Sequence, residues 1–361
     1  MKMESDFHMV KGEGETSYVK NSRLQQKALF ETKPVLEKAV RELCSSVLRQ
    51  NVVVGDLGCG SGENTLIFLS VVINAMSSRP VELQFFLNDL PGNDFDHTFR
   101  SLERLKKSTT GDHGKEETLP PFYVAALPGS YYTRLFPYQS VYLFHSSYCL
   151  HWRTRLPDGV DGNGTNIYIA KTTPLSVVKL YQEQFEKDLL LFLELRHREL
   201  VFGGQMVLTF LGRKDEDVYN GELNYLYEPL AQSLQSLVEK GLVEEDKVNS
   251  FNPPFYGASV DEVKKVVKRS GLFDITHIKL FESNWDPYDD SEDDNVQDSI
   301  QSGLNIAKSI RAVTETLFVS QFGASILDEL FREYANKISR YLERGEKKTY
   351  SVIVLTLKRG R

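Results

Sequence analysis

Short apolar runs alternate with stretches of helical periodicity along most of the chain. Residues 22–49 carry apolar side chains at the spacing of one helix face, which predicts a helix over this range. The expected buried face of this helix consists of Leu29, Val35, Leu36, Val40 and Leu43. The β-branched run 52–54 ends in a glycine-rich turn and predicts a strand that is buried on both faces. Residues 64–76 then predict a helix that returns along the sheet.

Six further apolar runs of strand length follow this first unit. They cover residues 81–89, 121–127, 139–147, 204–212, 273–282 and 350–359. Helical stretches separate several of them, notably residues 176–200. Strands that alternate with helices indicate an α/β fold built on a mainly parallel sheet. The last two runs have no glycine-rich loops, so we expect a seven-stranded sheet that these two strands close in mixed orientation.

Two segments interrupt the alternation. Residues 100–120 are charged and polar, and we expect a surface loop there. Residues 215–345 are mostly helical in pattern and are expected to form a cap over the carboxyl ends of the strands, where open α/β sheets bind ligands. Within them, the acidic run 286–298 lacks the ligand arrangement of an EF-hand, so we interpret it as a solvated loop.

Composition narrows the class of protein. The chain has 361 residues, of which 41% are hydrophobic and 26% charged, which excludes a disordered chain. Its formal net charge of −7 gives no general attraction to nucleic acid or to anionic membranes. Three scattered cysteines offer neither a disulfide framework nor zinc-ligand spacing. The polar start is not a signal peptide and the longest apolar stretch, 66–76, is too short to span a bilayer, so we expect a cytoplasmic protein.

The strongest chemical signal is the glycine-rich turn after the first strand. Asp56 is followed by Gly58, Gly60 and Gly62, and glycine lets a backbone turn tightly and approach a ligand. A dinucleotide fingerprint would need a further glycine where Glu63 stands. The pattern D-x-G-x-G-x-G instead resembles the S-adenosylmethionine loop of Rossmann-like methyltransferases, with the turn of another nucleotide-binding sheet as the alternative.

A second signal lies at the end of the next strand, in Asn88, Asp89 and Leu90. An acidic side chain at this place can accept hydrogen bonds from both hydroxyls of a ribose. The alternative is a simple turn that ends the strand. Together with the glycine-rich turn, Asp89 favours the nucleotide site.

The chain resembles the plant SABATH methyltransferases, which methylate small carboxylic acids or, in the caffeine branch, xanthine nitrogens. The motifs that carry the resemblance span nearly the whole chain, at 8–25, 56–65, 86–95, 127–137, 144–152, 166–174, 203–213 and 251–256. The resemblance implies a class I methyltransferase with a helical cap. Residues 30–214 and 346–361 would form the Rossmann-like core that binds S-adenosylmethionine, and residues 1–29 and 215–345 the N-terminal segment and substrate cap. It also implies a homodimer.

The resemblance assigns site residues position by position. Those around the methyl donor would be Tyr18, Ser22, Asp56, Gly58, Asn64, Asp89, Leu90, Ser130 and Tyr131. Those around the acid would be Gln25, Tyr148, His151, Trp152, Leu226 and Tyr227. Gln25 and Trp152 would hold the substrate carboxylate through neutral N–H donors.

Some positions depart from the family pattern. Glu63 replaces a proline, Tyr227 replaces a tryptophan of salicylate-preferring members, and His151 replaces a methionine. A metal or structural site of some members corresponds to Asn166, Asn249, Phe251 and Asn252. Because Asn249 stands where those members have an acidic residue, the departure weakens the expectation of Mg²⁺.

The implied reaction is an in-line displacement at a sulfonium methyl by a carboxylate oxygen. A carboxylic acid with a pKa of about 4 arrives ionised and needs no general base, so the site has to position it and exclude water. Without the resemblance, Trp152 would be interpreted as a core aromatic and Gln25 as a surface residue. His151 shapes the pocket or serves as a base for N–H substrates, and Cys59 and Cys149 are small packing residues.

The leading functional hypothesis is a carboxyl O-methyltransferase of an aromatic acid such as benzoate, salicylate or anthranilate. Tyr148, Trp152, Tyr227 and Phe255 would form its aromatic pocket. Alternatives within the family are methylation of jasmonate, of indole-3-acetate or of a xanthine nitrogen. Alternatives outside it are a nicotinamide-dependent oxidoreductase and a binding protein without activity.

Overall fold

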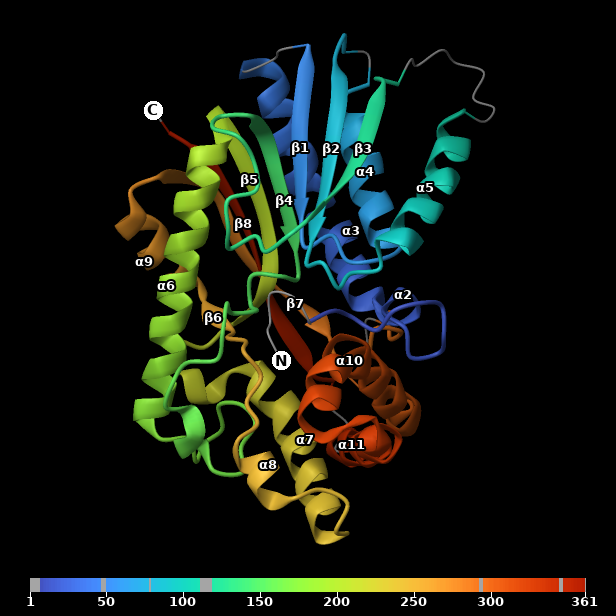
Figure 1. Cartoon of the computed structure of the whole chain (residues 1–361), viewed down its shortest axis with the longest axis vertical. Coiled ribbons are helices and arrows are strands. Elements are labelled where there is room, and N and C mark those ends of the chain that lie inside the picture. The colour runs from blue at the N-terminus through green and yellow to red at the C-terminus, as the bar shows by residue number, and fades with distance from the viewer. Residues whose placement is uncertain are drawn as a thin grey trace.

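A twisted mixed sheet forms the centre of the molecule (Figure 1). The computed structural model describes residues 7–46, 50–77, 79–110, 119–291, 295–343 and 347–360. The sheet has the order β3-β2-β1-β4-β5-β8-β7. Its strands are β1 (Asn51–Leu57), β2 (Glu82–Asp89), β3 (Phe122–Pro128), β4 (Val141–Ser147), β5 (Leu200–Arg213), β7 (Phe273–Asn284) and β8 (Thr349–Arg359). These are the seven predicted strands, and a two-residue strand that was not predicted, β6 (Ala258–Ser259), pairs with β5.

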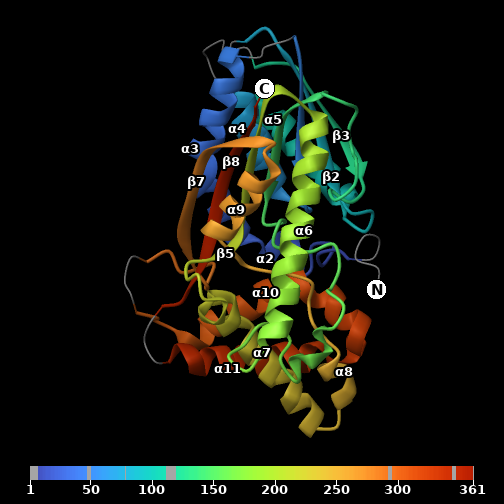
Figure 2. The same cartoon turned by 90° about the vertical axis from the view of Figure 1, so that its left-hand side faces the viewer.

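The orientation of the strands confirms the mixed sheet. Strands β1 to β5 pair in parallel, whereas β8 runs antiparallel to both β5 and β7. Parallel neighbours need crossover helices, and these helices lie on both faces of the sheet (Figure 2). The carboxyl ends of β1 to β4 therefore meet at one edge.

Most of the helices are at least 11 residues long. They are α3 (Arg23–Ser46), α4 (Glu63–Ala75), α5 (Phe95–Thr110), α6 (Leu175–Glu199), α7 (Glu222–Glu239), α9 (Val260–Ser270), α10 (Ser299–Phe322) and α11 (Leu327–Leu342), with the short α2 (Tyr18–Asn21) and α8 (Glu245–Asn249). None of the helices within the described ranges is both long and apolar enough to cross a membrane.

Two apolar clusters lie on opposite faces of the sheet. Alternate side chains of β5 point to each of them, because successive strand residues face opposite sides. Met206 and Leu208 pack toward α6, and Val207 packs toward α3 and α4. Burial on both faces explains why this strand appears in the sequence as a continuous apolar run.

The polar segment 100–120 is not simply a loop, and this prediction was wrong for its first half. Helix α5 continues to Thr110, since its buried Leu102 joins the cluster that α3 and α4 cover. Residues 111–118 lie outside the described part of the chain, as do residues 47–49 at the end of the predicted first helix.

A second, helical layer lies beyond the carboxyl ends of the strands (Figure 1). Helix α11 packs there against both α7 and α10. The range 215–345 also contributes β6, α9 and β7 to the sheet layer, because the 12 residues of β7 pair with β8 along its length. The division of the chain into a core and a cap stays a prediction.

The acidic run 286–298 is anchored at its beginning. Asp286 is buried and accepts hydrogen bonds from Ser302 Oγ at 2.7 Å and Asn305 Nδ2 at 3.1 Å, which tie it to α10. The prediction of a solvated loop is therefore wrong for this residue, whereas Tyr288 and Asp290 are exposed. Residues 292–294 lie outside the described ranges.

Candidate active site

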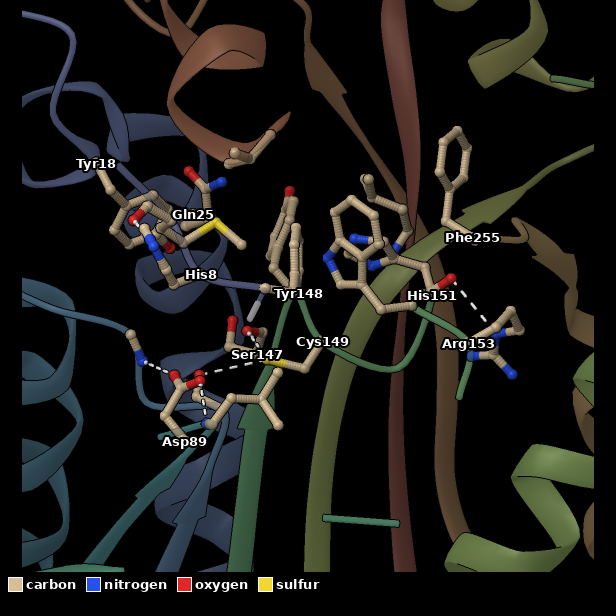
Figure 3. A pocket seen from close by; sticks show the side chains of 18 of the residues that line it. His8, Tyr18, Gln25, Asp89, Ser147, Tyr148, Cys149, His151, Arg153 and Phe255 are labelled. Atoms are coloured by element: carbon tan, nitrogen blue, oxygen red, sulfur yellow. Dashed lines mark hydrogen bonds between the residues drawn. The ribbon is translucent and has the colours of Figure 1, made fainter. Parts of the chain in front are cut away.

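One pocket opens between the sheet and the helical layer (Figure 3). It is lined from the loops after β1, β2, β3 and β4, from the segment before α2, and from α7 and α10. Its empty space, including the open mouth, is about 1330 Å³. The lining combines aromatic and aliphatic side chains with a few polar groups, as is usual for a small-molecule site.

The glycine-rich turn forms one end of the pocket. Gly58, Gly60 and Gly62 have φ angles of 74°, 63° and 110°, which favour glycine. A Cβ on Gly58 would lie 2.2 Å from Sγ of Cys149. The N–H groups of Gly58 and Cys59 donate to the carbonyl of Asn88, at 2.8 and 2.9 Å, so the turn after β1 is fastened to the end of β2.

Asp89 lies in the pocket at the end of β2. Its Oδ2 accepts from the N–H of Gly60 at 2.7 Å and its Oδ1 from the N–H of Leu90 at 2.7 Å. Burial raises the pKa of Asp89 to about 6, although the two N–H groups act in the opposite direction. Its remaining lone pairs are available to hydroxyl donors of a ligand.

Tyr18 covers the glycine turn from α2. Its ring would lie 3.2 Å from a Cβ on Gly60, and its buried hydroxyl is paired with Asn64, which lowers a pKa that burial raises more strongly. Asn64 also donates to the carbonyl of Ser22 at 3.3 Å. Asn64 and Ser22 thus join α4 to the start of α3 and are not among the residues that line the pocket.

Asp56 is likewise turned away from the pocket lining. Its Oδ1 lies 2.7 Å from Nδ1 of His145, and the imidazole stacks on Phe68 at 4.2 Å between ring centroids. Both members of the pair are buried. The structure therefore places Asp56 behind the glycine turn, where it supports β1 and β4.

The other end of the pocket holds most of the residues expected around an acid. In the view of Figure 3, the side chain of Tyr148 stands between those of Gln25 and His151. Tyr148 has a φ of 59°, a strained conformation for a residue with a side chain, and its N–H donates to the carbonyl of Thr209 at 2.7 Å. The Tyr148 hydroxyl, Oε1 of Gln25 and Oγ of Ser147 are buried without a partner among the described residues.

Aromatic side chains wall this end. Trp152 packs against Phe7 at 4.8 Å and Phe255 at 5.8 Å between ring centroids. Tyr227 packs against Phe255 at 4.5 Å. Leu226 also faces the pocket from α7. The wall suits a flat apolar ligand that carries one polar group.

His151 is held in its neutral form. Burial, assisted by the positive charge of Arg153, lowers the pKa of His151 to about 3. Its Nδ1 accepts from the N–H of Leu211 at 3.4 Å, so Nε2 carries the ring proton. A neutral imidazole with so low a pKa is a hydrogen-bond donor at physiological pH and a poor general base.

Several lining residues were not predicted from the sequence. They are Phe7, His8, Met9, Leu24, Tyr132, Ser147, Arg153, Ser309, Ile310, Val313 and Tyr350, among others. Ser147 and Arg153 stand directly beside predicted site residues in the sequence, so their position could have indicated that they line the pocket. The residues of α10 carried no such signal, because they are brought to the pocket only by the packing of the helical layer.

Asn166, Phe251 and Asn252 of the implied metal site have other partners, whereas Oδ1 of Asn249 is buried without a partner among the described residues. Oδ1 of Asn252 accepts from Asn163 Nδ2 at 2.9 Å and from the Tyr181 hydroxyl at 3.3 Å. The amide of Asn166 donates to Thr172 Oγ1 at 2.9 Å, and Phe251 packs against Phe318. With Asn249, the set contains no carboxylate, so it does not fit Mg²⁺. Elsewhere in the described ranges, no group of three or more His, Cys, Asp or Glu side chains is placed to hold a metal ion.

Comparison with known proteins extends over the whole chain. A family model described as SAM dependent carboxyl methyltransferase matches residues 4–360. The chain is 54% identical to anthranilate O-methyltransferase 1 of Zea mays, over 100% of this chain and 98% of the relative. It is 51% identical to benzoate O-methyltransferase of Zea mays, over 99% and 100%. A solved structure, loganic acid methyltransferase with SAH, superposes with a TM-score of 0.83 at 28% identity, over 98% and 99% of the two chains.

Proposed function

The chain belongs to the SAM-dependent carboxyl methyltransferase family, and we propose that it converts a small aromatic acid, anthranilate or benzoate, into its methyl ester. The observation that carries this proposal is the pocket itself, in which the glycine turn and Asp89 adjoin a chamber with an aromatic wall. Relatives with those two acids in their names share more than half of their residues with this chain. The oxidoreductase alternative has no such support.

We propose that Asp89, Gly58 and Gly60 hold the methyl donor. The ionised Asp89 would accept hydrogen bonds from both ribose hydroxyls, and the glycine turn leaves room for the amino-acid part of the methyl donor. Leu90, Ser130 and Tyr131 line the same end and are proposed to enclose the adenine. When bound, S-adenosylmethionine supplies an electrophilic methyl group on a sulfonium.

At the acid end, Gln25 and Trp152 are proposed to orient the carboxylate through neutral N–H donors. Held by Gln25 and Trp152, an ionised carboxylate oxygen would accept the methyl group without any proton transfer, and the positive charge of the donor would be lost with it. The chain therefore needs no base, which agrees with the low pKa of His151. Its work is to hold the oxygen in line with the methyl group and to keep water out.

Among the two acids, we propose anthranilate as the better substrate. Oε1 of Gln25 is a buried acceptor without a partner in the described ranges, and Oγ of Ser147 and the Tyr148 hydroxyl, which can donate or accept, also have no partner there. An unpaired buried acceptor costs about 1–3 kcal/mol, so a ligand with an N–H donor next to its carboxylate satisfies more of the site than benzoate does.

The test is transfer of label from methyl-labelled S-adenosylmethionine to a panel of acids. The panel contains anthranilate, benzoate, salicylate, jasmonate, indole-3-acetate and 7-methylxanthine. We expect label in methyl anthranilate first and methyl benzoate second. Label in jasmonate or a xanthine would retain the reaction class and overturn the aromatic acid, and no transfer at all would overturn the proposed activity.

The variant Gln25→Leu provides a matched check of the acid end. It removes the amide while the aromatic wall and Asp89 stay in place. We expect kcat/KM for the acid to fall at least about tenfold, while the Kd for S-adenosylhomocysteine changes little. A parallel loss of both would show that Gln25 does not act on the acid.

We further propose that the chain works in the cytoplasm as a homodimer. Cys44, Cys59 and Cys149 are free thiols, as is usual in a reducing compartment. The homodimer rests on the resemblance to the family. Analytical ultracentrifugation of the purified chain tests it, and a monomer at all concentrations would contradict it.

A further inference from the structure

Two segments without regular helix or strand carry much of the candidate site. Residues 130–136 follow β3 and contribute Ser130 and Tyr131, and residues 149–154 follow β4 and contribute His151 and Trp152. We propose that α6 positions them through two separate charged pairs. Arg153 with Asp188 would position the segment that contacts the acid, and Arg196 with Glu199 the segment that contacts the methyl donor; the assignment of ligands rests on the proposed function.

The first pair holds the acid-contacting segment from both sides. The guanidinium of Arg153 donates to the carbonyls of Leu150 and His151 and lies 3.9 Å from Oδ2 of Asp188. The same carboxylate accepts from the N–H of Thr154 at 2.9 Å and from its hydroxyl at 2.8 Å. Asp188 therefore fixes the end of the segment, and Arg153 folds back to fix the carbonyls beside His151 and Trp152.

The second pair holds the cofactor-contacting segment in a similar way. Arg196 donates to the carbonyls of Tyr131 at 2.8 Å and Thr133 at 2.9 Å. Glu199 lies 2.7 Å from Arg196 and accepts from the N–H groups of Leu135 at 2.6 Å and Phe136 at 3.0 Å. Backbone donors and acceptors of one segment are thus satisfied by one ion pair.

The position of α6 allows one helix to contact both segments. The helix runs beside the sheet and continues to the helical layer (Figure 1). Asp188 and Glu199 are 11 residues apart, which is close to three turns, so they lie on one face of α6 about 16 Å from each other. That face is turned toward the two segments.

Burying these four charged side chains costs desolvation free energy, and a gain in the stability of the fold does not account for their presence. All four side chains are at most 2% exposed. Buried ion pairs are often no more stabilising than well-packed apolar residues of the same volume. What they provide here is a fixed direction for backbone groups of loops that lack a ladder of their own.

The two segments touch one another at two tyrosines. The hydroxyl of Tyr131 donates to the carbonyl of Cys149 at 3.0 Å, and that of Tyr132 to the carbonyl of Trp152 at 2.8 Å. Some effect will therefore cross from one segment to the other. The larger effect is expected on the ligand that each segment contacts.

The experiment compares two near-isosteric variants, each of which is the control for the other. Asp188→Asn should raise the KM for the acid about tenfold and change the KM for S-adenosylmethionine less than about threefold. Glu199→Gln should raise the KM and Kd for the methyl donor about tenfold and affect the acid less than about threefold. Equal rises in both KM values in either variant, or no change, would overturn the proposal.

A spectroscopic reading separates this inference from the proposed function. Trp152 and Trp285 are the two tryptophans of the chain, and Trp285 lies away from the pocket, where it donates to the carbonyl of Thr349. In a Trp285→Phe background, Asp188→Asn should shift Trp152 emission to longer wavelength, whereas Glu199→Gln should shift it clearly less. This result needs no ligand, so it tests the positioning of Trp152 even if methyl transfer is not found.

A second pair of variants applies if the single substitutions prevent folding. Arg153→Met with Asp188→Leu, and Arg196→Met with Glu199→Leu, replace each ion pair by apolar side chains. Melting temperature and circular dichroism establish that they fold. The same split between the two KM values is expected, and its absence in folded variants contradicts the proposal.

Discussion

Single residues at the cofactor end are constrained by the space around them and by charge. Gly58 has a positive φ and no room for a side chain, because Cys149 lies against it. Asp89 is kept in a part-buried position where its carboxylate is less acidic than usual. Each constraint predicts the effect of a single change.

The variant Gly58→Ala should abolish binding of the methyl donor and lower stability by about 2 kcal/mol or more, since the new Cβ would meet Cys149 Sγ at 2.2 Å. Gly164→Ala is the control, because Gly164 has a φ of 61° with nothing within 4 Å of the added Cβ. The control should lose only about 1 kcal/mol. Calorimetric titration with S-adenosylhomocysteine and chemical denaturation measure both. Equal effects of the two substitutions would contradict the role of Cys149.

Binding of the methyl donor should weaken as the pH falls below about 6, where Asp89 takes up a proton. The Kd for S-adenosylhomocysteine is expected to rise by up to tenfold per pH unit below this pKa, because the protonated acid accepts ribose hydroxyls poorly. Titrations between pH 5 and 8 measure it. The variant Asp89→Asn should bind weakly with a flat pH profile, and a steep profile in the variant would assign the effect to another group.

The same carboxyl affects the stability of the ligand-free chain with the opposite sign. Its folded pKa lies above the ordinary value of 3.8, so the folded state holds the proton more tightly than the unfolded state. Its contribution to stability is complete below pH 3.8 and is lost as the pH rises through about 6. Relative to Asp89→Asn, the native chain should lose roughly 1–3 kcal/mol between pH 4 and pH 7. Urea denaturation at the two pH values tests this.

At the scale of elements, the helical layer brings α10 close to the pocket by packing it tightly on α11. Gly303 is the point of closest approach, since a Cβ there would lie 2.2 Å from Ser339 Oγ and 2.7 Å from the carbonyl of Ala335. Farther along α10, Ser309, Ile310 and Val313 line the pocket. The crossing of the two helices thus sets the position of one pocket wall.

Gly303→Ala should therefore destabilise the chain by about 1–3 kcal/mol, although alanine is the better helix former. The same change should raise the KM for the acid more than that for the methyl donor, because α10 would move as a unit. Ser320→Ala, at an exposed position of the same helix, should be neutral or slightly stabilising. Thermal denaturation and steady-state kinetics measure the effects, and a stabilised Gly303→Ala chain would refute the close contact.

At the scale of the whole molecule, the pocket joins parts of the chain that are far apart in sequence. The N-terminal segment closes over it, with Phe7 against Trp152 and the N–H of Val10 bonded to the carbonyl of Ala312 at 3.0 Å. Gly12 N–H donates to Asp94 Oδ2 at 3.1 Å, which attaches the segment to the start of α5. A ligand in the pocket therefore contacts both layers at once.

S-adenosylhomocysteine at 100 times its Kd should stabilise the whole chain by about 2.7 kcal/mol and raise Tm by a few degrees in one cooperative transition. Asp89→Asn should remove most of this shift at the same ligand concentration. Differential scanning calorimetry measures both. Two separate transitions, of which only one responds, would show that the layers unfold independently.

The sequence by itself determined the strands and their order along the chain, and it predicted Gly58 and Asp89, which the structure brings together at one end of the pocket. These features depend on local patterns: a buried strand needs a continuous apolar run, and a turn such as that at Gly58 needs glycine. Asp89 was located because it ends a strand, and the carboxyl ends of parallel strands meet at one edge. The resemblance to a family, carried by ordered motifs, added the residues of the acid end.

Tertiary structure decided where side chains point and which distant segments meet. Asp56 and Asp89 both lie at the carboxyl ends of strands, yet Asp56 pairs with His145 whereas Asp89 faces the pocket. Phe7 and the α10 residues reach the pocket only through packing between segments some 300 residues apart. The charged segment at 100–110 is helical because burial of Leu102 in the apolar core stabilises the helix. Such choices depend on the free energy of contacts between remote parts of the chain, which no local pattern contains.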